Sequence, residues 1–309
     1  MGKPKNPSKL TGLHILLTYQ CTFECDHCFA WGSPWQKGTL SLPEIREILA
    51  QAKELKSINQ IYFEGGEPFL YYATLVKAVD MIHQAGLNVG IVSNAYWAIT
   101  PEDAIEWLRP LAGKLTDLSV SSDLFHYDET YSRQARNASQ AASALGIPTG
   151  LICIVKPDSD AAKEPFGTIS SGSDEAESAI MFRGRAAIKL APNSHMHPWE
   201  SYMACPHEDL RSPGRLHLDP LGYLHICQGI TIGNVFDQSI KDIWEHFDPE
   251  AHPIVSPLLA GGPAELRRLY GGAPCEDFAD ACHLCYQTRA NLRSKFRDTL
   301  APDQMYGVF

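Results

Sequence analysis

Short apolar runs alternate with stretches of helical period through the first 190 residues. The runs have the length of buried strands and predict β-strands at residues 13–18, 60–64, 88–93, 116–121, 147–155 and 187–190. Between the first five of them, apolar residues recur every three or four positions, which predicts helices at residues 41–56, 72–85, 101–111 and 127–145. Ser41 followed by Glu44, and Thr100 followed by Pro101, are typical of helix N-termini. Repeated strand-then-helix units predict an α/β fold with a parallel sheet, either open or curled toward a barrel.

The regular alternation ends near residue 156. Residues 156–178 are rich in Ser, Asp, Gly and Pro and predict a flexible loop, either a functional lid or a plain surface insertion. After about residue 199, the runs 215–219 and 223–227 predict a β-hairpin, and residues 239–246 predict a short helix. This segment has too few long elements to build a large core alone. We therefore divide the chain into an N-terminal tail (1–12), a main α/β domain (13–198) and a small C-terminal domain (199–309).

The charge balance narrows the range of partners. The chain has 26 Lys and Arg against 36 Asp and Glu, a formal net charge of -10, and 44% of its residues are hydrophobic. An acidic globular chain is not typical of proteins that coat nucleic acid or anionic membranes. The apolar runs are far shorter than the roughly 20 residues that span a bilayer, and the N-terminus lacks the apolar core of a signal peptide. We expect a cytoplasmic protein that binds neither nucleic acid nor membrane.

Nine cysteines are the most informative part of the composition. In a reducing compartment, clustered cysteines indicate metal ligands or catalytic groups more often than disulfides. Cys21, Cys25 and Cys28 follow the first predicted strand with the spacing C-x3-C-x2-C, which chance would produce about 0.01 times in such a chain. Three thiolates leave one position open, which suits an iron–sulfur cube with one iron free of protein ligands. A zinc site completed by His14 or His27 is the alternative.

This cysteine motif resembles that of the radical S-adenosylmethionine (radical SAM) superfamily, in which an aromatic residue precedes the third cysteine. His27 fills that position, and in the family it packs near the adenine. The segment Gly65-Gly66-Glu67-Pro68, at the end of the second predicted strand, matches the family's GGEP segment, which meets the amino group of the methionine moiety. The resemblance implies a partial (β/α)6 TIM-like barrel that binds a [4Fe-4S] cluster through the three cysteines, together with S-adenosylmethionine.

Weaker likenesses follow at later strand ends. Ser93 and Asn94 resemble the family's T-N-G turn, although Ala95 replaces the glycine. The resemblance also implies cofactor contacts for three further residues: Ser121, Asp123 and Arg133. Arg183 and Arg185 lie in a G-R-A-like stretch, where they either hold a substrate carboxylate or phosphate or form a solvated basic turn.

The C-terminal cysteines resemble those of the SPASM and shorter twitch domains of radical SAM enzymes, which hold auxiliary iron–sulfur clusters. Five cysteines are too few for the longer pattern, so the likeness implies a twitch-type domain with one auxiliary [4Fe-4S] cluster. The expected ligands are Cys205, Cys227, Cys282 and Cys285, with Cys275 as an alternative. Cys153 lies in an apolar strand and is expected to be a small buried hydrophobe.

The family resemblance implies an enzyme, of oxidoreductase type, that reductively cleaves S-adenosylmethionine to a 5'-deoxyadenosyl radical. That radical would take a hydrogen atom from a small metabolite or a peptide, with flavodoxin or ferredoxin as electron donor. One alternative is a peptide maturase that works with a separate recognition partner. An alternative of another class is a non-catalytic zinc or iron–sulfur scaffold.

Overall fold

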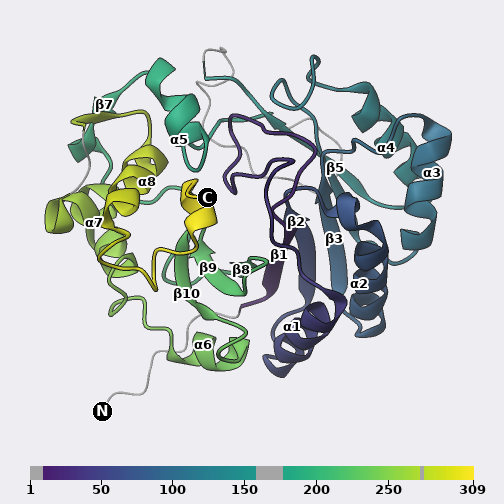
Figure 1. Ribbon diagram of the computed structural model, residues 1–309, viewed down its shortest axis with the longest axis horizontal. Helices are drawn as coiled ribbons and strands as arrows, with labels where there is room; N and C mark the ends of the chain where they lie inside the picture. The colour runs from purple at the N-terminus through teal and green to yellow at the C-terminus, as the bar shows by residue number, and fades with distance from the viewer. Residues whose placement is uncertain (1–9, 158–176, 272–274) are drawn as a thin grey trace.

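The computed structural model describes residues 10–157, 177–271 and 275–309. Its main feature is a nine-stranded sheet with the order β10-β9-β8-β1-β2-β3-β4-β5-β6 (Figure 1). The strands are β1 (Gly12–Thr18), β2 (Gln60–Gly65), β3 (Asn88–Ser93), β4 (Asp117–Ser121), β5 (Thr149–Ile154), β6 (Glu177–Ser178), β8 (Arg215–Leu218), β9 (Tyr223–Cys227) and β10 (Ile230–Asn234). A two-stranded sheet pairs β7 (His197–Pro198) with β11 (Asp277–Phe278).

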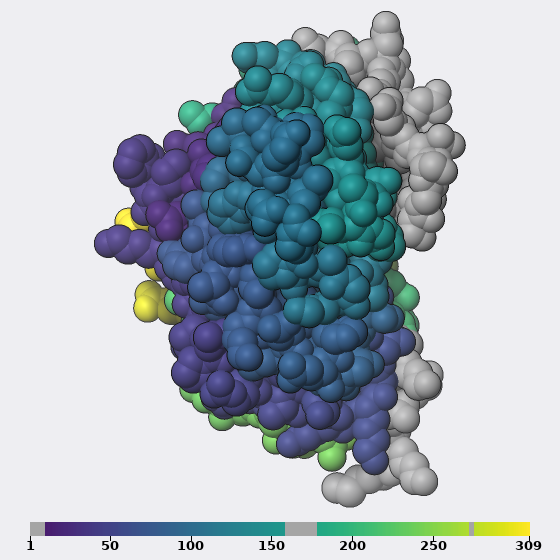
Figure 2. Space-filling model, turned by 90° about the vertical axis from the view of Figure 1, so that its right-hand side faces the viewer, coloured from purple at the N-terminus to yellow at the C-terminus, as the bar shows by residue number. Residues whose placement is uncertain are grey.

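Strands β1 to β6 are parallel neighbours in chain order. The helices between the first five are α1 (Leu42–Glu54), α2 (Tyr72–Gln84), α3 (Pro101–Leu108) and α4 (Arg133–Ala144). These four helices lie together on the outside of the sheet, and Figure 2 views the molecule from their side. The predicted α/β class with a partial barrel of parallel strands is confirmed.

The helix boundaries follow from local chemistry. Ser41 accepts a hydrogen bond from the backbone of Glu44, and the Glu44 side chain accepts one from the Ser41 backbone, which completes the predicted capping box. Thr100 caps α3 in the same way through Asp103. Helix α4 begins later than predicted, because Ser132 rather than residue 127 caps it.

The predicted strand at residues 187–190 is wrong. These residues belong to helix α5 (Ala186–Lys189), where the N–H groups of Lys189 and Leu190 donate to carbonyls four residues earlier. Alanine favours a helix, and a short apolar run cannot by itself distinguish the two structures. The sixth parallel strand is instead β6, beside β5. Most of the predicted loop at 156–178, and most of the predicted tail at 1–12, lie outside the described residues.

The C-terminal part of the chain extends the main sheet. Strand β8 pairs in parallel with β1, and β8, β9 and β10 continue as antiparallel neighbours. Helices α6 (Ile240–His246), α7 (Val255–Tyr270) and α8 (Ala281–Leu292) follow. One buried hydrophobic cluster contains residues from both parts, for example Ile15 of β1, Leu216 of β8 and Leu292 of α8. The residues on the two sides of the expected domain boundary near residue 199 therefore contribute to one hydrophobic core. Across the described ranges, no helix is both long enough and apolar enough to cross a membrane.

Candidate functional site

The first cysteine group lies on the loop that follows β1. The N–H groups of Phe23 and Gly32 donate to the sulfur atoms of Cys21 and Cys28, at 3.5 and 3.2 Å. The pKa of Cys21 is raised to about 12, chiefly by burial and in smaller part by the negative charges of Glu67 and Cys28. Three thiols gathered in a buried loop become thiolates when a cationic centre binds them. The donor set therefore fits an iron–sulfur cluster with three protein ligands.

The Gly65-Gly66-Glu67-Pro68 segment packs directly on the chain that leads into this loop. The Gly66 N–H donates to Thr18 O at 2.7 Å, and the Glu67 N–H donates to Gln20 O at 2.8 Å. A Cβ atom on Gly66 would lie 2.0 Å from Gln20 O, so only glycine permits this approach. Pro68 begins a buried 3-10 turn at Pro68–Tyr71. The two predicted motifs thus form one backbone-to-backbone unit.

Glu67 connects this unit to the turn after β3. Its buried carboxylate accepts hydrogen bonds from Ser93 Oγ at 2.9 Å and from the Asn94 N–H at 2.8 Å. Asn94 Nδ2 in turn donates to Thr22 Oγ1 at 3.0 Å, inside the cysteine loop. Ala95, at the expected glycine position, adopts a positive φ of 57°, which is unusual for alanine. Ala95 therefore adopts a backbone conformation that glycine reaches more readily.

Asp123 and His27 lie on the other side of the cysteine loop. Asp123 is fully buried, and its Oδ1 atom accepts hydrogen bonds from the Phe125 N–H at 2.9 Å and from the ring of His126, also 2.9 Å away. Burial lowers the pKa of His27 to about 4, and its Nδ1 atom has no hydrogen-bond partner among the described residues. An unpartnered buried ring nitrogen fits a ligand that supplies the missing hydrogen bond.

A cavity of about 440 Å³ opens beside these residues. Glu24, Cys25, Phe125, Leu190 and Asn193 are among its lining residues. Pockets of a few hundred cubic ångströms are typical of small-molecule sites. The cavity therefore places a ligand-sized space directly against the second cysteine of the motif.

Two further residues are predicted to contact the cofactor, namely Ser121 and Arg133. Ser121 is the last residue of β4, at the strand end that faces the cysteine loop region. Arg133 is the first residue of α4, and its side chain is exposed. Cofactor binding by these residues stays a prediction.

Arg185 holds the cysteine loop in place. Its guanidinium donates to Cys25 O at 2.6 Å and to Gly32 O at 2.9 Å, and only 3% of the residue is exposed. Gly184 has a φ of +60°, and a Cβ there would lie 2.6 Å from Cys28 O. Two of its donors thus hold the loop backbone, and substrate binding by Arg185 stays a prediction. Arg185 is not part of a solvated turn.

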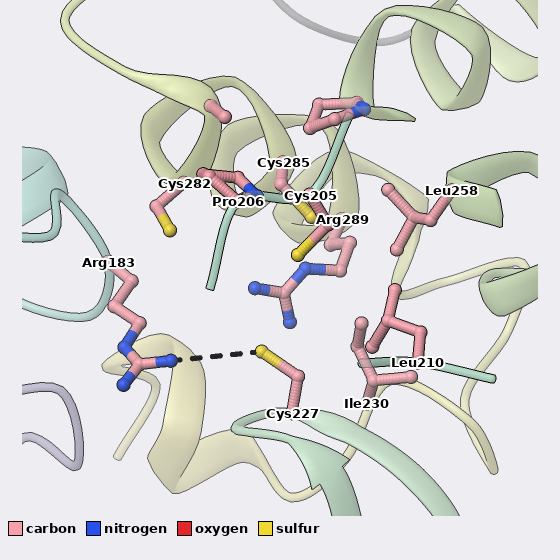
Figure 3. Close-up of a pocket in the computed structure, with 12 residues that line it drawn as sticks. Arg183, Cys205, Pro206, Leu210, Cys227, Ile230, Leu258, Cys282, Cys285 and Arg289 are labelled. Atoms are coloured by element: carbon pink, nitrogen blue, oxygen red, sulfur yellow. Dashed lines mark hydrogen bonds between the residues drawn. The ribbon is translucent and has the colours of Figure 1, made fainter. Parts of the chain in front are cut away.

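The four C-terminal cysteines that are expected to bind an auxiliary cluster lie close together, and cluster binding by them stays a prediction. Cys205, Cys227, Cys282 and Cys285 line one small cavity between β9, α8 and the segment before β8 (Figure 3). Their sulfur atoms point toward a common space. Cys275 is exposed and is not among the lining residues, so the choice of the other four agrees with their placement. Cys153 is buried in β5, as expected.

Two arginines approach the same cavity. Arg183 Nη1 donates to Cys227 Sγ at 3.9 Å. The sequence around Arg183 did not predict this contact with a C-terminal cysteine. Arg289 is 2% exposed and donates to Gln228 O at 2.9 Å, yet its Nε atom has no partner among the described residues. Burial raises the pKa of Cys227 to about 11, and both arginines oppose that rise. Arg183 is partly buried and also lies 3.7 Å from Glu208, whereas Arg289 is fully buried. Two cations beside four thiols fit an anionic metal–thiolate centre, which would help to compensate their charge.

Sequence reasoning missed Arg289 entirely. The one available signal is its spacing, since Arg289 follows Cys285 by four residues on α8 and so lies on the same helix face. Tyr306, whose hydroxyl accepts from Arg289 Nη1 at 3.1 Å, comes from the distant C-terminus and carries no local signal.

Comparisons with known proteins agree with this geometry. Residues 15–162 match the family model of the radical SAM superfamily. YydG of Bacillus subtilis (strain 168), which is named for peptide biosynthesis, is 27% identical over 124 residues, covering 40% of this chain and 39% of YydG. An S-adenosylmethionine-dependent nucleotide dehydratase of Selenomonas ruminantium is 26% identical over 146 residues, covering 47% of this chain and 50% of that protein. The chain spans about a third to a half of the length of the curated relatives it matches.

Solved structures share the fold over most of the chain. BtrN in complex with AdoMet and 2-DOIA gives a TM-score of 0.51 at 19% identity, covering 78% of this chain and 84% of that one. Streptococcus suis SuiB bound to S-adenosylmethionine gives 0.54 at 15% identity, covering 85% and 75%. These two likenesses concern the fold. The match to the radical SAM superfamily model covers residues 15–162, slightly less than half of the chain, and contains the three-cysteine loop and the Gly65-Gly66-Glu67-Pro68 segment.

Proposed function

We propose that this protein is a radical SAM enzyme that removes a hydrogen atom from a peptide or small-molecule substrate. Cys21, Cys25 and Cys28 would hold a [4Fe-4S] cluster, and S-adenosylmethionine would bind beside it. When bound, these groups supply one-electron cleavage of the sulfonium to methionine and a 5'-deoxyadenosyl radical, which abstracts the hydrogen atom. The observation that carries the proposal is the direct packing of the GGEP segment on the three-cysteine loop.

The chain's own residues would position and enclose this chemistry. Arg185 fixes the cysteine loop through two backbone carbonyls. Glu67 holds the GGEP segment against the turn at Ser93 and Asn94, so that backbone groups of both segments are fixed before a ligand arrives. His27 would offer a neutral ring nitrogen to the ligand's base. Such preorganisation reduces the reorganisation needed at the reacting atoms.

We further propose that Cys205, Cys227, Cys282 and Cys285 hold an auxiliary [4Fe-4S] cluster in a twitch-type C-terminal domain. Convergence of all four on one cavity supports this assignment, and so does the approach of Arg183 and Arg289 to it. A tetra-thiolate [4Fe-4S] cluster carries net negative charge, which the two guanidinium groups would balance. The cluster would accept an electron in a net oxidation or bind the substrate.

A peptide is the favoured substrate class. The support is YydG, a relative named for peptide biosynthesis, which aligns with 40% of this chain. An electron donor such as flavodoxin or ferredoxin would reduce the first cluster. A small metabolite stays the second candidate, because the relatives also include enzymes named for nucleotide dehydration.

The first test is cleavage of the cofactor. Protein reconstituted anaerobically with iron and sulfide, and reduced with dithionite, should convert S-adenosylmethionine to 5'-deoxyadenosine. Cys25→Ala should abolish that product, whereas Cys153→Ala, a buried cysteine outside both groups, should retain it. Zinc at full occupancy with no turnover, even with candidate peptides, would favour the non-catalytic scaffold instead.

Counting iron tests the auxiliary cluster separately. A variant with alanine at Cys21, Cys25 and Cys28 should retain about four irons per chain. A second variant, Cys227→Ala with Cys285→Ala, should lose about four and still bind S-adenosylmethionine. If the triple variant contained no iron, the proposal of an auxiliary cluster would be wrong. The proposal for the first cluster would be unaffected by that result.

A further inference from the structure

Three polar side chains meet on the inner face of the sheet, which is the face opposite α1–α4. They are His14 of β1, Glu64 of β2 and His217 of β8, on three adjacent strands. In β2, Ile61 and Phe63 are buried in the hydrophobic core, and by alternation Glu64 points the other way. The register pairs His14 with His217, so both rings lie on the same face as Glu64.

The contacts within this group leave buried polar atoms unsatisfied. His14 Nδ1 lies 3.4 Å from Glu64 Oε2, and His217 Nε2 lies 3.3 Å from Glu64 Oε1. Both separations exceed those of a good charged hydrogen bond. Glu64 Oε1 and His217 Nδ1 are buried without a hydrogen-bond partner among the described residues, and His217 is only 5% exposed. A bound ion is one of the ways in which such atoms are satisfied in native proteins.

One ligand atom from each of the three residues lies within 4.8 Å of the other two. Two imidazoles and one carboxylate on one side of a shared centre form a facial triad, a donor set that suits Fe²⁺, Mn²⁺, Zn²⁺ or Co²⁺. Arg215, one of the charges that act on Glu64 and His217, is paired with Glu208 at 3.4 Å. The Tyr62 ring stacks on His14, with centroids 5.0 Å apart, and fixes that imidazole from its far side.

We propose that His14, Glu64 and His217 bind one divalent transition-metal ion on the inner face of the sheet. This site is separate from both cysteine groups. His14 and Glu64 are partly exposed, with side-chain exposures of 17% and 14%, so the open coordination positions face solvent-accessible space. An oxygen or nitrogen donor of a small molecule or peptide would occupy those positions.

Strand geometry places the metal site deep in the barrel. Four residues separate His14 from Thr18 at the end of β1, which corresponds to about 13 Å along the strand. The cysteine loop begins only after Thr18. A ligand bound to this metal would therefore extend toward the cysteine loop along the inner face of the sheet, in the direction from His14 to Thr18 of β1. Metal binding itself does not depend on the proposed radical chemistry.

The test uses cluster-loaded protein under anaerobic conditions with Mn²⁺ as the probe, because Mn²⁺ prefers oxygen and nitrogen donors and leaves the cysteines to iron. Loss of the free-Mn²⁺ EPR signal measures binding, without S-adenosylmethionine or turnover. Wild type should bind one Mn²⁺ per chain, and Glu64→Gln should bind it at least tenfold more weakly. Asp80→Asn, which removes a partly buried carboxylate of α2 that pairs with Lys114, is the matched control and should bind as wild type does.

His14→Gln provides a second variant, on a more exposed residue, if Glu64→Gln fails to fold. Iron content and far-ultraviolet circular dichroism establish folding in each case. Zn²⁺ retained after gel filtration, counted by mass spectrometry, should fall in the same variants. Equal Mn²⁺ affinity in wild type and folded variants, or no binding by wild type at millimolar Mn²⁺, would overturn the proposal. Failure of S-adenosylmethionine cleavage would leave this result untouched, so the two proposals fail separately.

Discussion

Gly66→Ala tests the contact that joins the two cofactor-binding motifs. A Cβ atom at this position would lie 2.0 Å from Gln20 O and 2.5 Å from Gln20 C. Both are backbone atoms, so no side chain can rotate away. Ordinary contact begins at 3.4 Å, and the two segments must therefore separate by about 1.4 Å.

That separation breaks the hydrogen bond from the Glu67 N–H to Gln20 O, now 2.8 Å long. Overpacking costs about 1–3 kcal/mol and the lost bond about 1 kcal/mol, so we expect destabilisation of about 2–4 kcal/mol. For a chain of 309 residues this lowers the thermal midpoint by roughly 3–6 °C. A misplacement of this size should also reduce 5'-deoxyadenosine formation by about 100-fold.

Two controls separate this steric effect from a general effect of alanine. Gly214→Ala meets nothing within 4 Å and should be neutral. Gly146→Ala also meets nothing but has a φ of +67°, so it should cost only the backbone strain, about 1 kcal/mol. Thermal scans and product measurement by chromatography are made on all three variants. The reasoning would be refuted if Gly66→Ala had the same thermal midpoint as Gly214→Ala and cleaved S-adenosylmethionine at the wild-type rate.

Three further substitutions test other parts of the structure. Arg185→Met removes both donors that hold the cysteine loop, so iron per chain should fall from about eight toward about four; full iron with normal cleavage would contradict this role. Arg289→Met removes a buried positive charge beside the proposed auxiliary cluster, which should lower the reduction potential of that cluster by roughly 100 mV in an EPR redox titration. An unchanged potential would argue against charge compensation. Asp219→Ala leaves the buried Tyr19 hydroxyl and His225 ring without their shared acceptor, so the free energy of unfolding should fall by about 3–5 kcal/mol in thermal scans. A fall below about 1 kcal/mol would mean that solvent replaces the carboxylate.

Local patterns predicted the parallel strands well, because a buried parallel strand needs a continuous apolar run. They failed at residues 187–190, where an apolar run forms helix α5. Besides the helix propensity of alanine, Gly184 and Arg185, directly before this helix, pack against the cysteine loop, and these contacts span about 160 residues of sequence. A window of neighbouring residues contains no information about such a contact.

The sequence by itself predicted two groups of metal-binding cysteines and the spacing within the first of them. Spacing brings Cys21, Cys25 and Cys28 onto one short loop whatever the rest of the chain does, and the GGEP segment requires glycine for close backbone approach.

Tertiary structure alone decided which distant groups meet. It placed Arg289 against the C-terminal cysteines, excluded Cys275 from them, and set His14, Glu64 and His217 side by side. The physical reason is that β8 pairs with β1 although about 200 residues separate them. Strand pairing at that separation depends on the whole core, whereas the spacing within a loop depends only on the loop.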